Sequence, residues 1–549
     1  MTDLGKNSEM QRPSIKVGGT RAWITFTLLS SLFTLPASAS PRTTEESASS
    51  SGRRSEGEAF KRNRAERDRQ PQGCPEGVRL AGSINASSTK PNIITIITDD
   101  QGWADIGYNN PKVYTPNLDA LAAESALCTR HYSMPQCTPT RIAAFTGRYP
   151  GRFGNAGLTA NMEPVFPHGT FNLATFLKAN GYKTYLSGKW HMGGTEPHGP
   201  HHHGFDSTYG SYAGAIGYYD HRYRPKHKDE ITWNRDGKII EGYENGQHVT
   251  DLVTDEAVRI IEENQESDQP FFLYLAYHAP HTPLDERGEF IDTPTQLDPE
   301  NPTRWLNEDK IKWFHDPKGI IQSEPDPEKR LLLAVIHHLD HGIGQVIKAL
   351  DASGQRDNTL ILFSSDNGPQ VNWPGNAYPD DLKLTDFNQE IPLRGKKCDT
   401  YEGGIRVPGL VHWRGKIPAR KIDSPVHVVD WLPTIAGFIG TEALVSEDQP
   451  ALDGQNNAAI FLTKADPSTR LIYQLWGRPP NRRALTLGPW KIVHYGKKEP
   501  KESDWELYDL GKDARESKNL AKKHPDKIKQ LHQLFVTERA KDRKTKSNL

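Results

Sequence analysis

The chain has 549 residues, of which 25% are charged and 35% hydrophobic, and its formal net charge is −1. That length allows one large domain and a smaller one, and the composition is that of an ordinary globular protein. The balanced charge gives no long-range field that would attract nucleic acid or an anionic membrane, so we expect neither as a partner.

The first 39 residues have the features of a secretory signal peptide. A basic lead precedes the apolar run Ala22–Leu35 and the small-residue site Ala37-Ser38-Ala39, which predicts cleavage after Ala39. The run is short for a bilayer span, and a buried core helix is the alternative. We therefore expect an exported protein, periplasmic or secreted, without a stable membrane anchor. Residues 40–90 are rich in Ser, Arg, Glu and Gly, which predicts a disordered linker.

From Pro91 onward, strand and helix patterns alternate. Strands are predicted over Asn92–Thr98, Tyr182–Ser187, Phe271–Tyr277, Thr359–Ser365 and Arg406–Trp413. Helices are predicted over Asn117–Leu127, Phe171–Asn180, Thr250–Glu263, Pro327–Leu350 and Pro425–Phe438. Continuous apolar strands between helices indicate an α/β domain, over 91–440, with a large and mainly parallel sheet covered by helices.

The pattern changes after about residue 441. The short runs Arg483–Leu487, Lys491–Val493 and Leu507–Leu510 predict a small antiparallel sheet, and a charged helix over 525–541 follows. We therefore expect a C-terminal subdomain over 441–549.

Polar residues directly follow four of the predicted strands. They are Asp99-Asp100, Lys189 with His191, His278 with His281, and Asp366-Asn367. Because the carboxyl ends of parallel strands share one edge, where ligands bind, these four clusters are expected to converge.

The oxygen donors Asp99, Asp100, Asp366 and Asn367 suit calcium or magnesium. A single Asp-Asp pair after a strand is more often a helix cap or a turn, but two such pairs favour a metal site. The side chains of Lys189, His191, His281 and Lys397 would add positive charge and proton donors around an anionic ester. Their alternative is an ordinary place on surface loops.

Cys137 begins the run C-T-P-T-R, and four residues later Thr146-Gly147 follows. The proline two residues after Cys137 predicts a helix that starts there, which would put the cysteine at a natural anion site. Arg141 lies one turn in and could steady an oxyanion or the nucleophile. On spacing alone, a small buried core cysteine is the alternative.

Two further patterns favour plain structural interpretations. His198 and His201–His203 form a histidine-rich tract, for which a solvated or substrate-facing loop is favoured over zinc binding. Gly403-Gly404 is too short for a phosphate-binding loop and predicts a tight turn.

At these residues the sequence resembles the formylglycine-dependent sulfatases of the alkaline-phosphatase superfamily. The matching stretches run from about 91 to 521 and are NIITIITDDQGWADIGY, TPNLDALAAES, CTPTRIAAFTGRYP, GYKTYLSGKWHMG, GFDSTYG, FFLYLAYHAPHTPL, LILFSSDNG, PLRGKKCDTYEGGIRVP and ELYDLGKDARESKNLA. The resemblance implies an alkaline-phosphatase-like fold with a large mixed sheet, and hydrolysis of a sulfate ester.

The resemblance also implies a mechanism. A maturation enzyme, the formylglycine-generating enzyme, would oxidise Cys137 to a formylglycine that is present as a geminal diol. One diol oxygen would attack sulfur, and the second hydroxyl would then expel sulfate and restore the aldehyde. One calcium ion would bind Asp99, Asp100, Asp366, Asn367 and the modified Cys137.

The roles of the remaining residues follow from the same resemblance. Arg141 and Lys189 would orient the modified residue, and His191 would be the base that triggers elimination. His281 and Lys397 would bind sulfate oxygens, and one of the two would protonate the leaving alcohol.

One position differs from the family motif, and two others have a neighbouring residue of the same type. Thr140 stands where the family motif has Ser, and it keeps the hydroxyl. Lys397 is chosen over Lys396 for its spacing to Glu402-Gly403-Gly404. His281 is chosen over His278 because His281-Thr282-Pro283 fits the family's H-x-P.

The stretch Gly204–Gly210 with Gly214–Tyr219 looks most like the arylsulfatase B type, which acts as an N-acetylgalactosamine-4-sulfatase. This suggests a sulfated carbohydrate substrate, or an aryl sulfate, with Tyr218, Asp220, His221 and Arg222 as candidate substrate contacts. An acidic residue common at the Gly217 position is absent. The alternatives are a phosphomonoester or phosphonate hydrolase on the same scaffold, and an unmodified protein that binds sulfated glycans.

Overall fold

A ten-stranded mixed sheet lies at the centre of the fold, with the strand order β12-β2-β11-β9-β1-β8-β4-β5-β6-β7 among the residues that the structure describes. The computed structural model describes residues 90–219, 221–223, 231–240, 247–282, 284, 317–370, 393–463 and 469–543. The predicted signal peptide and nearly all of the predicted linker lie outside these residues, as does Asp220. The described residues belong to one compact unit, Gly82–Leu549.

The middle of this sheet is parallel, as the sequence predicts. In spatial order it contains β9 (Thr359–Ser365), β1 (Asn92–Thr98), β8 (Phe271–Ala276), β4 (Lys183–Lys189) and β5 (Ser207–Ser211). Every residue of β1, β8 and β9 is buried, because helices cover both faces of the sheet.

Shorter strands extend the sheet at both edges. They are β2 (Ala126–Cys128), β11 (Gly409–His412) and β12 (Arg420–Ile422) at one edge, and β6 (Trp233–Arg235) and β7 (Lys238–Ile239) at the other. Strand β11 pairs with its neighbours in the antiparallel sense, as does β6, so the sheet is mixed.

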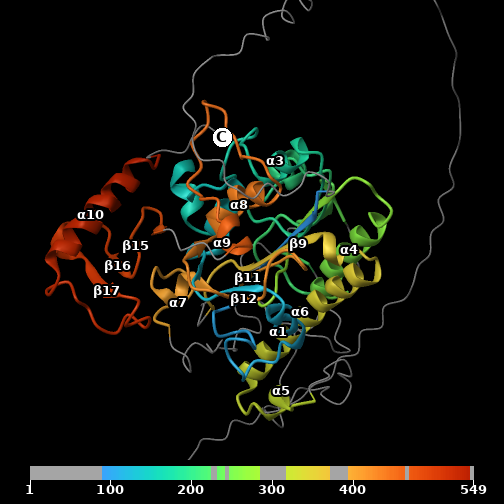
Figure 1. Cartoon of the computed structure of the whole chain (residues 1–549), viewed down its shortest axis with the longest axis horizontal. Coiled ribbons are helices and arrows are strands. Elements are labelled where there is room, and N and C mark those ends of the chain that lie inside the picture. The colour runs from blue at the N-terminus through green and yellow to red at the C-terminus, as the bar shows by residue number, and fades with distance from the viewer. Residues whose placement is uncertain are drawn as a thin grey trace, which may run out of the picture. The chain divides into compact units, whose positions relative to one another are not determined.

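The two faces of β1 pack against different helices, since successive side chains of a strand point to opposite faces. Ile94 and Ile96 lie in one buried cluster with residues of α1 (Pro116–Ala123), α4 (Val249–Glu263) and α6 (Pro327–Ala352). Ile93 and Ile97 lie in another with residues of α2 (Cys137–Thr146), α3 (Leu173–Ala179) and α8 (Trp431–Phe438). Figure 1 shows α1, α4 and α6 grouped together, and α3 and α8 on the other side of the sheet.

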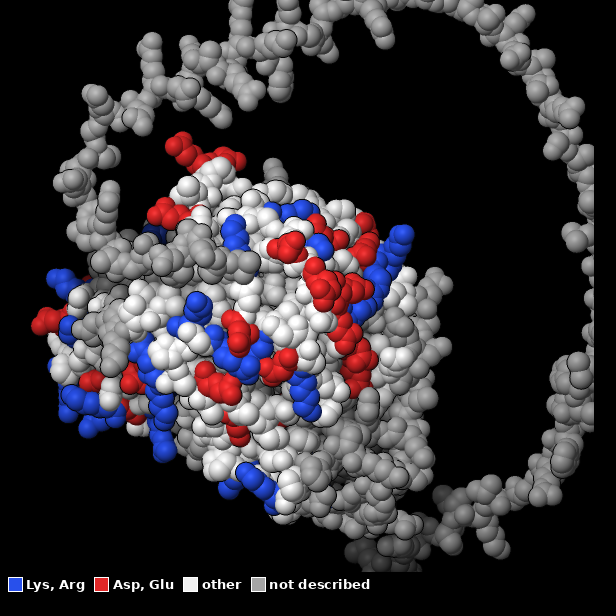
Figure 2. Space-filling model, turned by 45° about the vertical axis from the view of Figure 1, so that its right-hand side comes forward, with Lys and Arg blue, Asp and Glu red and all other residues white. Residues whose placement is uncertain are grey.

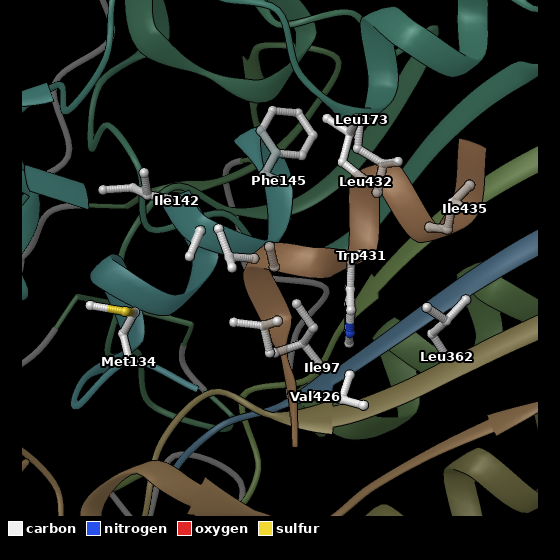
Figure 3. Close-up of a cluster of buried hydrophobic side chains, with 14 of the residues drawn as sticks. Ile97, Met134, Ile142, Phe145, Leu173, Leu362, Val426, Trp431, Leu432 and Ile435 are labelled. Carbon is white, nitrogen blue, oxygen red and sulfur yellow. The ribbon is translucent and has the colours of Figure 1, made fainter. Parts of the chain in front are cut away.

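Helix α2 is held by the second cluster, which Figure 3 draws. The Phe145 ring lies with its centroid 5.3 Å from that of Trp190, edge-on, and 5.6 Å from that of Phe205, stacked. The other labelled side chains come from neighbouring elements: Ile97, Met134, Ile142, Leu173, Leu362, Val426, Trp431, Leu432 and Ile435. This packing fixes the helix whose first residue is Cys137.

Four predicted elements differ from the structure. The strand expected over Arg406–Trp413 is divided at Pro408, which has no N–H to donate. Its first part, β10 (Arg406–Val407), pairs with β3 (His131–Tyr132), and β3 also pairs with β13 (Val426–His427).

The helix expected over 425–438 therefore begins later, at α8, after β13 and a 3-10 turn over Val428–Asp430. The helix expected over 117–127 ends at Ala123, and Ala126 and Leu127 belong to β2. The tight turn expected at Gly403-Gly404 is instead a short helix, α7 (Glu402–Ile405).

The predicted C-terminal antiparallel sheet is present. It contains β14 (Leu471–Trp476), β15 (Arg482–Leu487), β16 (Trp490–Tyr495) and β17 (Glu506–Asp509), and α10 (Pro525–Ala540) packs on it. These elements are red in Figure 1. Their side chains, such as Tyr473 and Leu531, join the same buried cluster as Ile97, so this sheet shares its core with the central one. The boundary near residue 440 stays a prediction.

On the face drawn in Figure 2, basic and acidic side chains are interspersed, in keeping with the nearly zero net charge. Within the described part of the chain, no helix combines the length and the apolar character that crossing a bilayer requires.

Candidate active site

The ends of β1, β8 and β9 and the start of α2 bring several of the predicted site residues together. One ligand atom each from Asp99, Cys137 and Asp366 lie within 4.8 Å of one another, and the same is true of Asp99, Asp100 and His281. All five residues are buried. Residues separated by more than 260 positions thus meet at one edge of the sheet, which is where open α/β sheets bind ligands.

Three carboxylates and one amide form the centre of this cluster. The Asp100 backbone N–H donates to Asp366 Oδ1 at 3.1 Å, and Asn367 Nδ2 donates to Asp100 Oδ1 at 2.7 Å. Burial, and next the Asp99 carboxylate, raises the pKa of Asp366 to about 7. Asp366 is therefore the carboxylate of this cluster whose negative charge is disfavoured by burial and by its neighbour Asp99.

Two oxygens of the cluster have no protein donor. Asp99 Oδ1 and Asn367 Oδ1 are buried and lack a hydrogen-bond partner among the described residues. The Asn367 amide nitrogen is already directed at Asp100 and at the Gly368 carbonyl oxygen, so its Oδ1 points away from both. Unsatisfied carboxylate and amide oxygens are the ligands that calcium prefers, so this donor set fits a hard divalent cation.

Cys137 is the first residue of α2, as its sequence context predicts, and it is 1% exposed. Burial raises the pKa of its thiol to about 11, against the opposing effect of the Lys189 and Lys397 ammonium groups. An unmodified Cys137 is therefore a neutral thiol at physiological pH and a poor nucleophile.

Two cations border the carboxylates, Arg141 from α2 and Lys189 from the end of β4. Arg141 Nη2 donates to Asp366 Oδ2 at 2.9 Å and lies 3.8 Å from Asp99 Oδ2, while its Nη1 donates to the Lys189 carbonyl oxygen at 3.1 Å. The Lys189 ammonium forms a short ion pair with Asp99. Both side chains are fully buried, so their charges act at low dielectric.

Lys397 and His281 lie around Asp100. Lys397 Nζ is 2.8 Å from Asp100 Oδ2, and His281 Nε2 is 3.6 Å from the same oxygen. Although burial opposes it, the Lys397 ammonium lowers the pKa of Asp100, and Asp100 in turn raises the pKa of Lys397. Gln370, which the sequence reasoning did not single out, has its Oε1 3.4 Å from Lys397 Nζ.

His191 lies in the loop after β4, with a positive φ of 55°. Its ring packs on Gly214, where an added Cβ would lie 2.0 Å from His191 Cε1, so a side chain at position 214 would displace the histidine. Burial, and next the Lys189 charge, lower the pKa of His191 well below its usual range, so the imidazole is neutral.

His278 contacts a strand, whereas His281 contacts the carboxylate cluster. His278 Nε2 is 2.7 Å from Ser211 Oγ on β5, and His281 Nε2 faces Asp100. The buried Thr140 hydroxyl accepts from the Met134 N–H at 3.0 Å and forms a short hydrogen bond with the Asp366 carbonyl oxygen.

Residues of the C-terminal sheet reach the site loops, and sequence reasoning missed them. Trp476 Nε1 donates to Gln136 Oε1 at 2.8 Å, directly before Cys137. Arg482 Nη1 donates to the Cys398 carbonyl oxygen at 2.8 Å, directly after Lys397. No local sequence pattern predicts these two contacts, because the two residues of each pair are more than 80 positions apart in the chain.

Two of the four candidate substrate contacts, Tyr218 and His221, are more enclosed than expected, whereas Arg222 is partly exposed. The Tyr218 hydroxyl donates to the His281 carbonyl oxygen at 2.9 Å, and His221 Nε2 lies 3.0 Å from the Gln247 carbonyl oxygen. Tyr218 is 1% exposed and His221 0%, which favours structural roles for both. Asp220 lies outside the described residues.

Comparison with known proteins identifies the family. The Sulfatase family model matches residues 91–441. Arylsulfatase J of Mus musculus is 29% identical over 76% of this chain and 66% of its own length. The N-acetylgalactosamine-6-O-sulfatase of Bacteroides thetaiotaomicron is 27% identical over 84% of this chain and 95% of its own length.

Solved structures agree with this assignment. The crystal structure of Ps i-CgsB superposes with a TM-score of 0.67 at 29% identity, and covers 83% of this chain and 94% of its own. The phosphonate monoester hydrolase of Silicibacter pomeroyi, at 20% identity and a TM-score of 0.53, shares the fold. The chain therefore belongs to the sulfatase family and is a sulfuric ester hydrolase.

Proposed function

We propose that this enzyme removes sulfate from a sulfated carbohydrate, with a formylglycine made from Cys137 as its nucleophile and one calcium ion bound beside it. The observation that carries the proposal is the pair of buried oxygens, on Asp99 and Asn367, that lack a donor among the described residues. These oxygens lie in the same cluster as Cys137. Cys137 is the first residue of α2 and is close to Lys189 and Lys397.

Asp99, Asp100, Asp366 and Asn367, with the modified Cys137, would hold the calcium. A bound calcium would polarise the sulfate group, and the diol form of a formylglycine would supply one hydroxyl for attack and a second for release. The high pKa of the unmodified thiol, about 11, supports the need for such a modification.

Four further side chains have proposed roles in the reaction. Arg141 bonds to Asp366 and to the Lys189 backbone, so it would fix residue 137 relative to the metal ligands. His191 is neutral and would take up the proton that release of sulfate requires. Lys397 stays charged, so it would bind sulfate oxygens together with His281, and one of the two would protonate the leaving alcohol.

A carbohydrate substrate is supported by what the relatives act on. Several are named N-acetylgalactosamine-6-sulfatase, and Ps i-CgsB has been solved in complex with k-i-k-neocarrahexaose. These relatives do not favour the 4-sulfatase type over the 6-sulfatase type. Export, with formylglycine installed by a maturation enzyme, is proposed from the signal-like residues 1–39.

A substrate panel tests the reaction class. The full chain, produced in a host that makes formylglycine, is assayed with an aryl sulfate, the matching aryl phosphate, and 4-O- and 6-O-sulfated N-acetylgalactosamine oligosaccharides. We expect kcat/KM to be higher for the sulfate than for the phosphate, and sulfate release from at least one oligosaccharide. A preference for the phosphate would favour the phosphohydrolase alternative, and release from the aryl sulfate alone would contradict an N-acetylgalactosamine 4- or 6-sulfate substrate.

A further inference from the structure

We propose a second metal site, for a divalent transition metal such as Zn²⁺, formed by Glu196, His201 and His202 in the loop that follows His191. This site is separate from the proposed calcium cluster and does not depend on the proposed function. It assigns a metal-binding role to part of the histidine-rich tract, for which the sequence alone favours a solvated loop.

The three candidate ligands are already gathered. His201 Nε2 lies 3.0 Å and His202 Nε2 lies 3.1 Å from the same oxygen, Glu196 Oε1. In a tetrahedral zinc site with bonds of about 2.0–2.1 Å, neighbouring ligand atoms are about 3.3 Å apart. A zinc ion could therefore replace the protons of these two histidine–glutamate hydrogen bonds, with only small movements of the side chains.

The backbone keeps these ligands in place. Glu196 begins a 3-10 turn over Glu196–His198, and His201 and His202 end a second one over Pro200–His202. Each turn has a proline in its first two positions, which limits the conformations of the loop before it binds. Little further ordering of the backbone is then needed when a metal binds.

The fold also leaves room for the His201 ring. A Cβ on Gly199 would lie 2.7 Å from His201 Cε1, and a Cβ on Gly237 would lie 2.7 Å from His201 Nε2. Gly237 belongs to the turn between β6 and β7 and has a positive φ of 83°. Two separate segments therefore lack a side chain where the imidazole is placed.

A buried polar group lies on the inner side of this loop. The Tyr212 ring centroid is 6.4 Å from that of His201, and the Tyr212 hydroxyl is buried without a hydrogen-bond partner among the described residues. Burial, and next the Glu196 carboxylate, raises the pKa of Tyr212, so its hydroxyl stays protonated and can donate. A hydrated metal ion is a candidate partner for such a group.

The donor types separate this site from the proposed calcium site. Two imidazoles and one carboxylate suit zinc and its neighbours, and they leave a fourth position for water. The proposed calcium site offers mainly carboxylate and amide oxygens, which suit a hard cation. Saturation with Ca²⁺ should therefore leave the Glu196–His201–His202 site free for a transition metal.

A second histidine cluster, His248 with Asp251 and His338, is less suited to bind metal. His248 Nδ1 accepts a hydrogen bond from the Thr250 N–H at 3.2 Å. The ring proton of neutral His248 is therefore on Nε2, the atom that would have to bind the metal. Neither His201 nor His202 has its other ring nitrogen fixed by such a donor among the described residues.

The experiment is a zinc titration of the calcium-saturated full chain by isothermal titration calorimetry. The variant is Glu196→Gln combined with His201→Ala, and the matched control is His198→Gln, in the same tract but outside the three-residue cluster. We expect the wild type and the control to bind one more zinc ion than the double variant. Any zinc at the calcium cluster is common to all three proteins and cancels in the comparison.

Cobalt absorption gives a second readout. The wild type loaded with Co²⁺ should show the visible bands of a four-coordinate imidazole site, which the double variant lacks. If the double variant does not fold, Glu196→Gln alone can be used, because the Glu196 side chain is 52% exposed. This single variant should weaken zinc binding by more than about tenfold, because loss of even an outer-sphere partner of a metal site weakens binding by that much. Equal zinc stoichiometry and affinity in wild type and variant, or no zinc bound by the calcium-saturated wild type, would overturn the proposal.

Discussion

Asp99 and Asn367 each bury an oxygen that no donor among the described residues satisfies. A buried polar atom without a partner costs about 1–3 kcal/mol, so this arrangement is unfavourable unless a cation completes it. The proposed calcium ion therefore links the stability of the whole fold to the chemistry of these individual side chains.

Removal of calcium should lower the melting temperature and abolish sulfatase activity. A ligand that binds only the folded state adds about 2.7 kcal/mol at a concentration one hundred times its Kd. Calorimetry with a calcium chelator, followed by addition of excess Ca²⁺, should show a reversible shift in the wild type. Asn367→Leu should show a much smaller shift, and an unchanged melting temperature of the wild type in chelator would refute the metal assignment.

Thr140→Ser should keep both activity and the formylglycine content, because the serine hydroxyl can make the same contacts with Met134 and Asp366. Thr140→Val, of similar shape but without the hydroxyl, should lose about 1–3 kcal/mol through the unpaired backbone groups. Urea unfolding measures the second effect, and peptide mass spectrometry the first. Equal stability of the wild type and the valine variant would show that the hydroxyl is dispensable.

Some site residues could be predicted from sequence because they directly follow apolar strands. Asp99 and Asp366 are of this kind, whereas His281, five residues after β8, is chosen over His278 through its resemblance to the family's H-x-P motif; all three lie at one edge of the sheet. Gln136 and Gln370 could not be predicted, since each touches the site loops through contacts with residues distant in the chain. An amide side chain in a loop carries no local signal of such a partner.

Helix α7 is anchored to the C-terminal sheet by a buried group of three charges. Lys491 Nζ, on β16, lies 2.9 Å from Glu402 Oε1 and 2.8 Å from Glu516 Oε1. Glu402 begins α7, and the loop before that helix carries Lys397. This group therefore ties the position of a proposed sulfate-binding loop to the small sheet.

Lys491→Met should destabilise the protein by about 3–5 kcal/mol, because it leaves two buried carboxylates without their ammonium partner. Chemical denaturation measures the change. Lys529→Met, an exposed position on α10, is the matched control and should change stability by less than about 0.5 kcal/mol. A loss no greater than that of the control would mean that the buried charges contribute little.

The same group predicts a pH dependence of stability. Two carboxylates share one lysine, and burial, opposed by Lys491 and assisted by Glu402, raises the pKa of Glu516 to about 7. Folded Glu516 thus holds its proton more tightly than unfolded Glu516, so the free energy of unfolding should fall as pH rises from 4.5 through about 7.

Glu516→Gln removes this titration, so the variant should gain stability relative to wild type over that pH range, by at most about 3 kcal/mol. Melting temperatures of both proteins at several pH values test it. Parallel curves for the two proteins would contradict the assignment.

Two of the four wrongly predicted elements share a physical cause. The expected strand over residues 406–413 is rich in apolar residues, yet Pro408 interrupts its hydrogen bonding and the two halves join different sheets. The helix expected over 425–438 starts late because its first residues pair with β3. Pairing with a distant strand outweighed local pattern in both cases, whereas the long helices α4 and α6 follow their apolar periodicity closely.

Across the whole molecule, the C-terminal sheet is part of the active-site architecture as well as of the core. Its residues Trp476 and Arg482 bond to the segments beside Cys137 and Lys397, and its apolar side chains continue the core of the central sheet. The two parts therefore form one structural unit, and under the proposed mechanism the state of residue 137 decides whether it is active.

The most direct measurement is the mass of the Cys137 peptide, taken beside the specific activity of the same preparation. Preparations with different degrees of maturation should show activity in proportion to their aldehyde content. Cys137→Ala should be inactive while it stays folded and keeps its calcium-dependent melting temperature. A fully active preparation that contains only unmodified Cys137 would contradict this account.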